Sequence, residues 1–149
     1  MTLNGTRFGA IQFTPREVVF FSEGLIGFED LHDFVQVPHG EDFCWLQSIR
    51  EPELAFLCAF TDSVCPDYSP ELNPFVQIAL DLTPDTERFM LATASIPGGK
   101  PDEMTLNLAA PIVVNAYSRH ALQCVVENEA YTVRHRIFPE AKKAYKLAA

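Results

Sequence analysis

Most apolar segments of the chain are short, rich in valine, isoleucine, phenylalanine and threonine, and alternate with polar positions at a period of two residues. This period is typical of half-buried β-strands, whose successive side chains point to opposite faces. Segments that contain glycine or proline separate these runs, as expected of turns. The pattern predicts strands at Arg7–Phe13, Glu17–Phe21, Phe34–Val37, Cys44–Ile49, Ala55–Phe60, Glu87–Ile96, Pro111–Asn115 and Leu122–Glu127.

Two segments favour short helices. Asn73 offers an N-cap and Pro74 a first helical residue ahead of Phe75–Leu82. The alternating valine, isoleucine and leucine of this segment also suit a buried strand, so both interpretations stay open. The segment Pro139–Leu147 joins an N-terminal proline and glutamate to good helix formers and late lysines, the order that the helix dipole favours. A helix of this length is marginal on its own and can also fray.

The length of 149 residues, 48% of them hydrophobic, suits one domain with its own core. Many short strands and little helix predict a mainly β fold, a small antiparallel β-barrel-like domain with one or two short helices, closed to protect its strand edges. We expect this single β domain to span residues 1–138. A basic C-terminal helix or tail follows at residues 139–149.

Charge is distributed unevenly along the chain. The net charge is −9, and residues 1–129 hold 19 of the 20 acidic residues, whereas residues 130–149 hold 5 of the 11 basic ones. An acidic body repels a phosphate backbone, so we expect no direct binding of nucleic acid. Opposite charge steers encounter, so the body favours a basic protein partner. A surface that is charged only for solubility is the alternative.

The sequence shows no sign of a membrane or an export signal. No apolar run approaches the roughly 18 residues needed to span a bilayer, and the N-terminus lacks the basic-then-apolar order of a signal peptide. The four cysteines form no C-x-x-C pair, which favours reduced thiols over disulfides. We therefore expect a soluble, cytoplasmic protein.

No set of side chains has the spacing of a metal site or of a cofactor motif. The four histidines are far apart in sequence and form neither H-x-x-x-H nor H-E-x-x-H. The chain also lacks a P-loop, a G-x-G-x-x-G and a G-x-S-x-G pattern. Pairs of carboxylates occur only at predicted turns, where solvated acids are common. We predict no metal and no cofactor.

A thiol-dependent enzyme stays open as an alternative. Cys65 lies beside Pro66 in a predicted loop, and His135 or His120 would serve as its base. A thiol inside an apolar strand behaves instead as a small hydrophobic group. This structural role suits the other three cysteines, Cys44, Cys58 and Cys124.

The loop Phe20–Leu31 has an unusual composition. Two glycines, three residues apart, hold Leu25, Ile26 and Phe28 in a segment that follows a predicted strand. Apolar residues in such a loop either plug the end of a barrel or dock a partner. The sequence leaves both roles open.

Four blocks occur in a specific order and spacing along the chain. They are G-L-x-G-F-E-D-L at Gly24–Leu31, W-L-Q-S at Trp45–Ser48, M-T-x-N-L-x-A-P-I-V-x-N at Met104–Asn115 and R-H at Arg134–His135. Each block alone is a weak signal, whereas the ordered set resembles the FliW flagellar assembly factor family. The resemblance runs from about Phe8 to Phe138, nearly the whole chain.

The resemblance implies a binding module that is not an enzyme. Family members bind cytoplasmic flagellin near its C-terminal helical region, as a chaperone before export, and many also bind CsrA, a small basic repressor of flagellin translation. The two partners exchange on FliW, which couples flagellin synthesis to export. An acidic body suits the basic CsrA, and apolar loop residues suit an amphipathic flagellin segment. We expect the protein to act as a monomer.

Candidate partner-binding residues follow from the loop and from the matched blocks. Leu25, Phe28 and Trp45 are candidate anchors, although core packing is an alternative for the two aromatic residues. A small-ligand-binding β-barrel with Trp45 lining its cavity is a further possible function. Asn107 and Asn115 either contact a partner or tie strands together as buried amides. The full set is Glu23, Leu25, Phe28, Glu29, Asp30, Trp45, Asn107 and Asn115.

Overall fold

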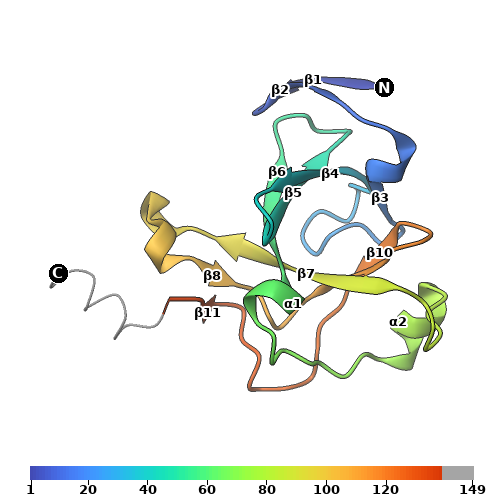
Figure 1. The fold of residues 1–149 in the computed structure, drawn as a ribbon, viewed down its shortest axis with the longest axis vertical. Helices are drawn as coiled ribbons and strands as arrows, with labels where there is room; N and C mark the ends of the chain where they lie inside the picture. The colour runs from blue at the N-terminus through green and yellow to red at the C-terminus, as the bar shows by residue number, and fades with distance from the viewer. Residues whose placement is uncertain (139–149) are drawn as a thin grey trace, which may run out of the picture.

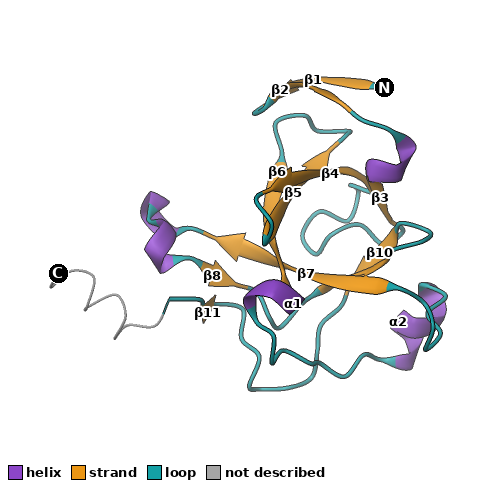
Figure 2. Ribbon diagram, viewed as in Figure 1, coloured by secondary structure: helices purple, strands orange, loops and turns teal. Residues whose placement is uncertain are grey.

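The computed structural model describes residues 1–138, so the predicted C-terminal helix lies outside the described residues. Figure 1 shows the fold, and Figure 2 colours the same view by secondary structure. The helices are α1 (Thr61–Val64) and α2 (Pro74–Ala79), with 3-10 turns at Pro15–Glu17, Pro97–Gly99 and Pro101–Glu103. The strands are β1 (Thr2–Thr6), β2 (Gly9–Gln12), β3 (Val18–Phe21), β4 (Asp33–His39), β5 (Phe43–Ser48), β6 (Ala55–Phe60), β7 (Arg88–Ser95), β8 (Thr105–Leu106), β9 (Ile112–Asn115), β10 (His120–Gln123) and β11 (His135–Arg136).

Seven of these strands close into a barrel. Their hydrogen-bonded order is β7-β6-β5-β4-β3-β10-β9, and β9 returns to β7 through residue pairs that run from Arg88↔Asn115 to Leu91↔Ile112. In Figure 1 the ring of strands surrounds the loop that follows β3. A closed ring removes most of the edges that would otherwise pair with other chains. The predicted mainly β, barrel-like fold is confirmed.

One pair in this ring is parallel. β3 and β10 are aligned through Phe20↔His120 and Phe21↔Ala121, whereas the other pairs of the ring are antiparallel. The expected antiparallel arrangement is therefore correct except at this point. Strand direction leaves no trace in the sequence pattern, because side chains alternate with the same period in parallel and antiparallel strands.

The N-terminal segment forms a separate hairpin in place of the single predicted strand at Arg7–Phe13. Gly5 and Gly9 adopt φ values of +79° and +76°, in the left-handed region that favours glycine, so the chain turns at Arg7 and Phe8. The hydroxyl of Thr6 donates to the carbonyl of Gly9 across this turn at 2.5 Å. The hairpin of β1 and β2 lies outside the barrel ring (Figure 1).

The shortest elements escape sequence analysis for a simple reason. The strands β8 and β11 have 2 residues each and α1 has 4, too few positions for a period to be read. The strand predicted at Leu122–Glu127 also differs in position: in the structure β10 begins at His120 and ends at Gln123. Over Cys124–Val126 the chain instead bonds to the loop before β9, through Cys124 N–H to Pro111 O and Val126 N–H to Ala109 O.

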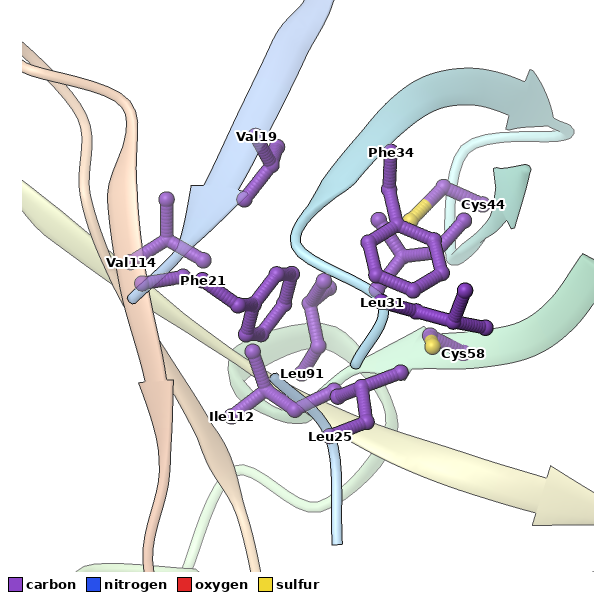
Figure 3. Packing of buried hydrophobic residues seen from close by; sticks show 12 residues of the cluster. Val19, Phe21, Leu25, Leu31, Phe34, Cys44, Cys58, Leu91, Ile112 and Val114 are labelled. Carbon is purple, nitrogen blue, oxygen red and sulfur yellow. The ribbon is translucent and has the colours of Figure 1, made fainter. Parts of the chain in front are cut away.

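The barrel interior is filled by apolar side chains from every strand of the ring (Figure 3). Phe21 and Phe34 meet edge to face, with ring centroids 5.4 Å apart, and neither is exposed to solvent. Alternation along the strands decides which residues face inward. The inward set is Val19, Phe21, Leu25, Leu31, Phe34, Cys44, Leu46, Cys58, Leu91, Ile112, Val114 and Ala121.

The outer face of the barrel carries α2. The Asn73 side chain accepts a hydrogen bond from the Phe75 N–H at 2.8 Å, and Pro74 is the first helical residue, so the predicted helix is confirmed over its strand alternative. Val76 packs with Val113 and other apolar residues on the outside of the barrel, while Phe75 and Ile78 stay exposed. No helix within residues 1–138 has the length and apolarity needed to cross a membrane.

Candidate functional site

The loop between β3 and β4 enters one end of the barrel and turns back on itself. Leu25 and Phe28 form an isolated bridge, in which the Phe28 N–H donates to Leu25 O at 2.7 Å and the Leu25 N–H to Phe28 O at 3.3 Å. Leu25 is 3% exposed and belongs to the barrel core, whereas Ile26 and Phe28 are 52% and 41% exposed. Leu25 thus plugs the barrel end, as one of the two roles predicted for the loop, while its neighbours face solvent and the docking role stays a prediction.

Gly24 is required for this turn. Its φ is +69°, and a Cβ atom placed on it would lie 2.5 Å from the backbone oxygen of Glu29, closer than real Cβ contacts allow. Gly27 also has a positive φ of +89°, but no atom lies within 4 Å of a Cβ there. The close packing of the two arms of the loop therefore depends on Gly24, while Gly27 only provides the backbone conformation.

A groove of about 430 Å³ opens beside this loop, and none of the described residues that line it is charged. We call it the apolar groove. The ring of Phe28 stands edge to face on Phe56 of β6 at 5.1 Å, and Val125 and Val133, which are 70% and 60% exposed, lie among its other lining residues. A concave surface with exposed valines, on a protein with a net charge of −9, fits a binding site for apolar side chains.

The two side-chain amides of the apolar groove, Asn107 and Gln123, are bonded within the protein. Asn107 accepts hydrogen bonds from the N–H groups of Ala109 and Ala110 at 3.2 and 3.1 Å. Gln123 accepts from the Ile26 N–H at 2.9 Å and donates to Ala110 O at 3.0 Å, which ties the plug loop to the segment before β9. These bonds hold the groove in shape and leave apolar contact, backbone edges and the hydroxyls of Thr93 and Ser95 for a partner.

An acidic hollow of about 650 Å³ adjoins the groove. Four carboxylates, Glu29, Asp30, Glu51 and Glu53, line it together with Phe28 and other apolar residues. In the part of the chain that the structure describes, none of the four carboxylates takes part in an ion pair; Glu29 accepts only the Gly27 N–H, at 3.3 Å. Phe28 lines both the hollow and the apolar groove, so the two surfaces are continuous.

The structure brings together most of the candidate residues from the sequence. Leu25, Phe28 and Asn107 line the apolar groove, and Glu29 and Asp30 line the acidic hollow. Glu23 is exposed on the same loop, two residues before Leu25. Sequence analysis missed the groove's other walls, because Phe56 reads as an ordinary strand residue and nothing in the sequence brings Val125 and Val133 together.

Trp45 lies elsewhere. It points to the outside of the barrel, where the Arg7 guanidinium lies 4.4 Å from its ring centroid and the Phe8 ring meets it edge to face at 5.4 Å. The barrel interior is filled by side chains, and Trp45 lines an outer hollow of about 300 Å³. For the small-ligand alternative, Trp45 therefore lines an outer hollow and not the barrel interior, because alternation along β5 turns Trp45 away from its neighbours Cys44 and Leu46.

Asn115 is a buried amide that joins three segments. It is 4% exposed, its NH₂ donates to Leu80 O at 2.8 Å, and its oxygen accepts from the N–H groups of Tyr117 and Ser118 at 3.0 and 3.1 Å. All of these partners lie within the protein. Asn115 therefore holds α2 and the turn after β9 against the barrel, which favours the strand-tying role considered from the sequence.

The thiol alternative finds two of its residues close together without the electrostatics that it needs. Cys65 and His135 line the same hollow of about 380 Å³, whereas His120 packs against Phe20 at 5.3 Å. Burial raises the pKa of the Cys65 thiol, the opposite of what a nucleophilic thiol requires. Within residues 1–138, no three histidine, cysteine or acidic side chains are grouped so that they could hold a metal ion.

Comparison with known proteins agrees with this architecture. The family model described as FliW protein matches residues 2–137. This chain belongs to the FliW family. Two flagellar assembly factors named FliW, from Caldanaerobacter subterraneus subsp. tengcongensis and Magnetococcus marinus, are each 36% identical to it, covering 99% and 97% of this chain and 100% and 89% of their own lengths. A crystal structure of a FliW flagellar assembly factor matches with a TM-score of 0.83 at 28% identity over 94% of this chain and 99% of that chain.

The blocks that carried the FliW resemblance lie in distinct parts of the fold. Gly24–Leu31 forms the plug loop and Trp45–Ser48 the second half of β5, while Met104–Asn115 runs from β8 along one wall of the groove into β9. Only the first and third blocks line the apolar groove. In this FliW chain the candidate binding surface is thus made of two sequence-distant blocks joined by residues from β6, β7 and the segments around β10 and β11.

Proposed function

We propose that this protein is a flagellar assembly factor that binds cytoplasmic flagellin through the apolar groove and acts as its chaperone before export. The observation that carries the proposal is an uncharged groove of about 430 Å³ on an acidic protein, with Ile26, Phe28, Val125 and Val133 exposed in its lining. Membership of the FliW family supports flagellin as the occupant.

The groove suits an amphipathic helix, such as the C-terminal helical region expected for flagellin. Such a helix places apolar side chains at intervals of three and four residues along one face, and a groove binds this stripe. Phe28 is a suitable anchor because its ring is held against Phe56 and its backbone is tied to the buried Leu25. An anchor that is already ordered loses little entropy on binding, which leaves more of its contact energy for affinity.

The acidic hollow is the proposed contact for CsrA. Its four carboxylates, which form no ion pair within residues 1–138, lie in a body that is acidic overall, and a small basic protein complements such a surface. Because Phe28 lines both the groove and the hollow, a partner that covers one surface crowds the other. Flagellin and CsrA would then exchange on a single monomer in the cytoplasm, which couples flagellin synthesis to export.

Isothermal titration calorimetry of the purified protein with flagellin from its own organism tests the first part. We expect micromolar or tighter binding, about −8 kcal/mol or better, that is lost when flagellin lacks its C-terminal helix. Phe28→Ala should weaken binding by at least tenfold, about 1.4 kcal/mol. Phe75→Ala is the matched control, since Phe75 is 62% exposed on α2 and away from the groove lining. Equal affinities for both variants would rule out the groove.

Charge reversal tests the CsrA contact separately. Glu53→Lys in the acidic hollow should weaken CsrA binding and reduce its dependence on salt, because the attraction is screened by ions. Asp85→Lys changes the net charge equally in an exposed turn outside the hollow. If both variants bind CsrA equally, net charge and not the hollow carries the contact; if the wild type shows no binding, the CsrA part of the proposal fails while the flagellin part stands.

A further inference from the structure

The strand β6 is paired along its whole length on one side only. Its pairs with β5 run from Ala55↔Gln47 to Ala59↔Phe43, whereas its pairs with β7 begin at Cys58↔Thr93. Beyond Thr93, the last residues of β7, Ala94 and Ser95, pair with β8 on the opposite edge of β7. Figure 1 shows this end of β7 leaving the ring of strands beside β8. Within residues 1–138, Ala55–Leu57 therefore form an open strand edge in an otherwise closed barrel.

The backbone groups of this edge point into the gap between β6 and β7. Leu54 O accepts from the Ser48 N–H at 3.0 Å, and the Phe60 N–H donates to Asp42 O at 2.9 Å. The backbone N–H and C=O groups of the even-numbered residues of this segment therefore point toward β5. Alternation then directs the N–H and C=O groups of Ala55 and Leu57 to the other side. The β7–β6 register, if continued, would place Leu57 opposite Ala94, but no such pair forms.

Both faces of the sheet are hollowed at this gap. The apolar groove lies on the inner face, and the 300 Å³ hollow beside Trp45 lies on the outer face. The two cavities share Phe56, Thr93 and Ala94. A strand that lay along the open edge would direct alternate side chains into these two cavities, because successive residues of a strand point to opposite faces.

We propose that this gap is a β-strand addition site, which binds an extended segment of a partner protein along Ala55–Leu57 with an apolar side chain in the apolar groove and an acidic side chain beside Arg7. Strand addition obtains affinity from backbone hydrogen bonds and specificity from alternating pockets, and the gap offers both. The proposal concerns a second mode of recognition. It rests on the open strand edge and not on the capture of flagellin, and its test uses synthetic peptides.

Charge decides which side chain the outer hollow accepts. Among residues 1–138, Arg7 is the only charged residue that lines it, and no carboxylate does. The carbon of the Arg7 guanidinium lies over two aromatic rings, 4.4 Å from the Trp45 ring centroid and 5.7 Å from that of Phe8. Among residues 1–138 the guanidinium has no acidic partner. A stacked guanidinium keeps its N–H donors available, and these donors match the geometry of a carboxylate.

Amide hydrogen exchange tests whether the edge is open. In the free protein the N–H groups of Ala55 and Leu57 should exchange faster than that of Ala59, which is paired with Ala92. Adding a blocked five-residue peptide of alternating valine and glutamate should slow exchange at Ala55 and Leu57. Equal protection of all three amides in the free protein would mean that the edge is closed, and the proposal would fail.

Peptide binding, followed by NMR titration, tests the chemistry of the two cavities. The valine–glutamate peptide should bind at least tenfold more tightly than a valine–lysine peptide, as one charged contact allows, and N-methylation of its edge-facing amides should abolish binding. Arg7→Glu should reverse the preference between the two peptides. Arg16→Glu makes the same change of charge at an exposed residue that does not line the outer hollow and should leave the preference unchanged.

Each contrary result overturns a stated part of the proposal. Binding that survives N-methylation excludes strand addition, and a peptide preference that Arg7→Glu and Arg16→Glu shift equally shows attraction to net charge only. If neither peptide binds and the exchange rates at Ala55 and Leu57 do not change, the gap is not a peptide site. These outcomes are independent of the flagellin titration, in which the readout is the loss of binding on Phe28→Ala.

Discussion

Leu25 and Phe28 are joined by two backbone hydrogen bonds, yet one side chain is buried in the barrel and the other is open to solvent. This arrangement fixes the position of an exposed aromatic ring through a neighbour that cannot move without opening the core. Stability and binding are therefore carried by different side chains of one short loop. Substitutions in the loop should separate the two properties.

Leu25→Ala should lower the free energy of unfolding by about 2–5 kcal/mol, because it removes a buried side chain and leaves a cavity at the barrel end. Urea unfolding followed by circular dichroism measures this loss. Phe28→Ala is the partner variant and should cost only about 1 kcal/mol, mainly through the lost contact with Phe56. A larger loss for Phe28→Ala than for Leu25→Ala would contradict the division of roles.

Gly24→Ala should destabilise the protein by about 1–3 kcal/mol, since its φ of +69° is strained for alanine and its Cβ would lie 2.5 Å from Glu29 O. Gly27→Ala meets the same kind of backbone strain at φ +89° with no atom near the added Cβ, so its cost should be smaller. Unfolding in urea compares the two. Equal losses would show that the close approach of the loop arms contributes nothing.

Asn115→Ala should cost about 1–3 kcal/mol, because it leaves the Leu80 carbonyl and the N–H groups of Tyr117 and Ser118 without their buried partner. Asn107→Ala removes two bonds at a half-buried position and should cost less. The measurement is the midpoint of thermal unfolding. A variant of Asn115 with normal stability but weakened flagellin binding would instead assign this residue to the partner surface.

The buried thiols should make the protein sensitive to alkali. Burial raises the pKa of Cys44 from 9.0 to about 12 and raises that of Cys58 as well, so the folded protein keeps these thiols protonated where the unfolded chain ionises. Their contribution to stability is therefore complete below pH 9 and is lost as the pH rises above it. Urea unfolding at pH 8 and pH 10 should show the lower stability at pH 10.

The same thiols differ in reactivity within the native state. At neutral pH an alkylating reagent should label Cys65 and Cys124, which are partly exposed, long before the buried Cys44 and Cys58. All four should react in urea. Rapid labelling of Cys65 at pH 7, faster than in the unfolded chain, would contradict its raised pKa and restore the thiol-enzyme alternative.

The sequence by itself predicts the local features of this protein. The period of two residues predicted most strands of the barrel, and Asn73 with Pro74 marked the start of α2, because both signals arise within a few residues of one another. The composition of the glycine-bracketed loop alone also marked it as a candidate for plugging the barrel or docking a partner. Where the signal was too short, as in β8 and β11, the sequence could not supply a prediction.

Where the sequence allowed alternative roles or pairings, only the tertiary structure decided between them. The sequence offered both plugging and docking for the loop, and the barrel end accepted Leu25 while leaving Phe28 outside. The parallel pairing of β3 with β10 and the meeting of Val125 with Val133 at the groove depend on how distant segments close the ring. Such contacts follow from packing between residues far apart in the chain, and the pattern of neighbouring residues does not predict them.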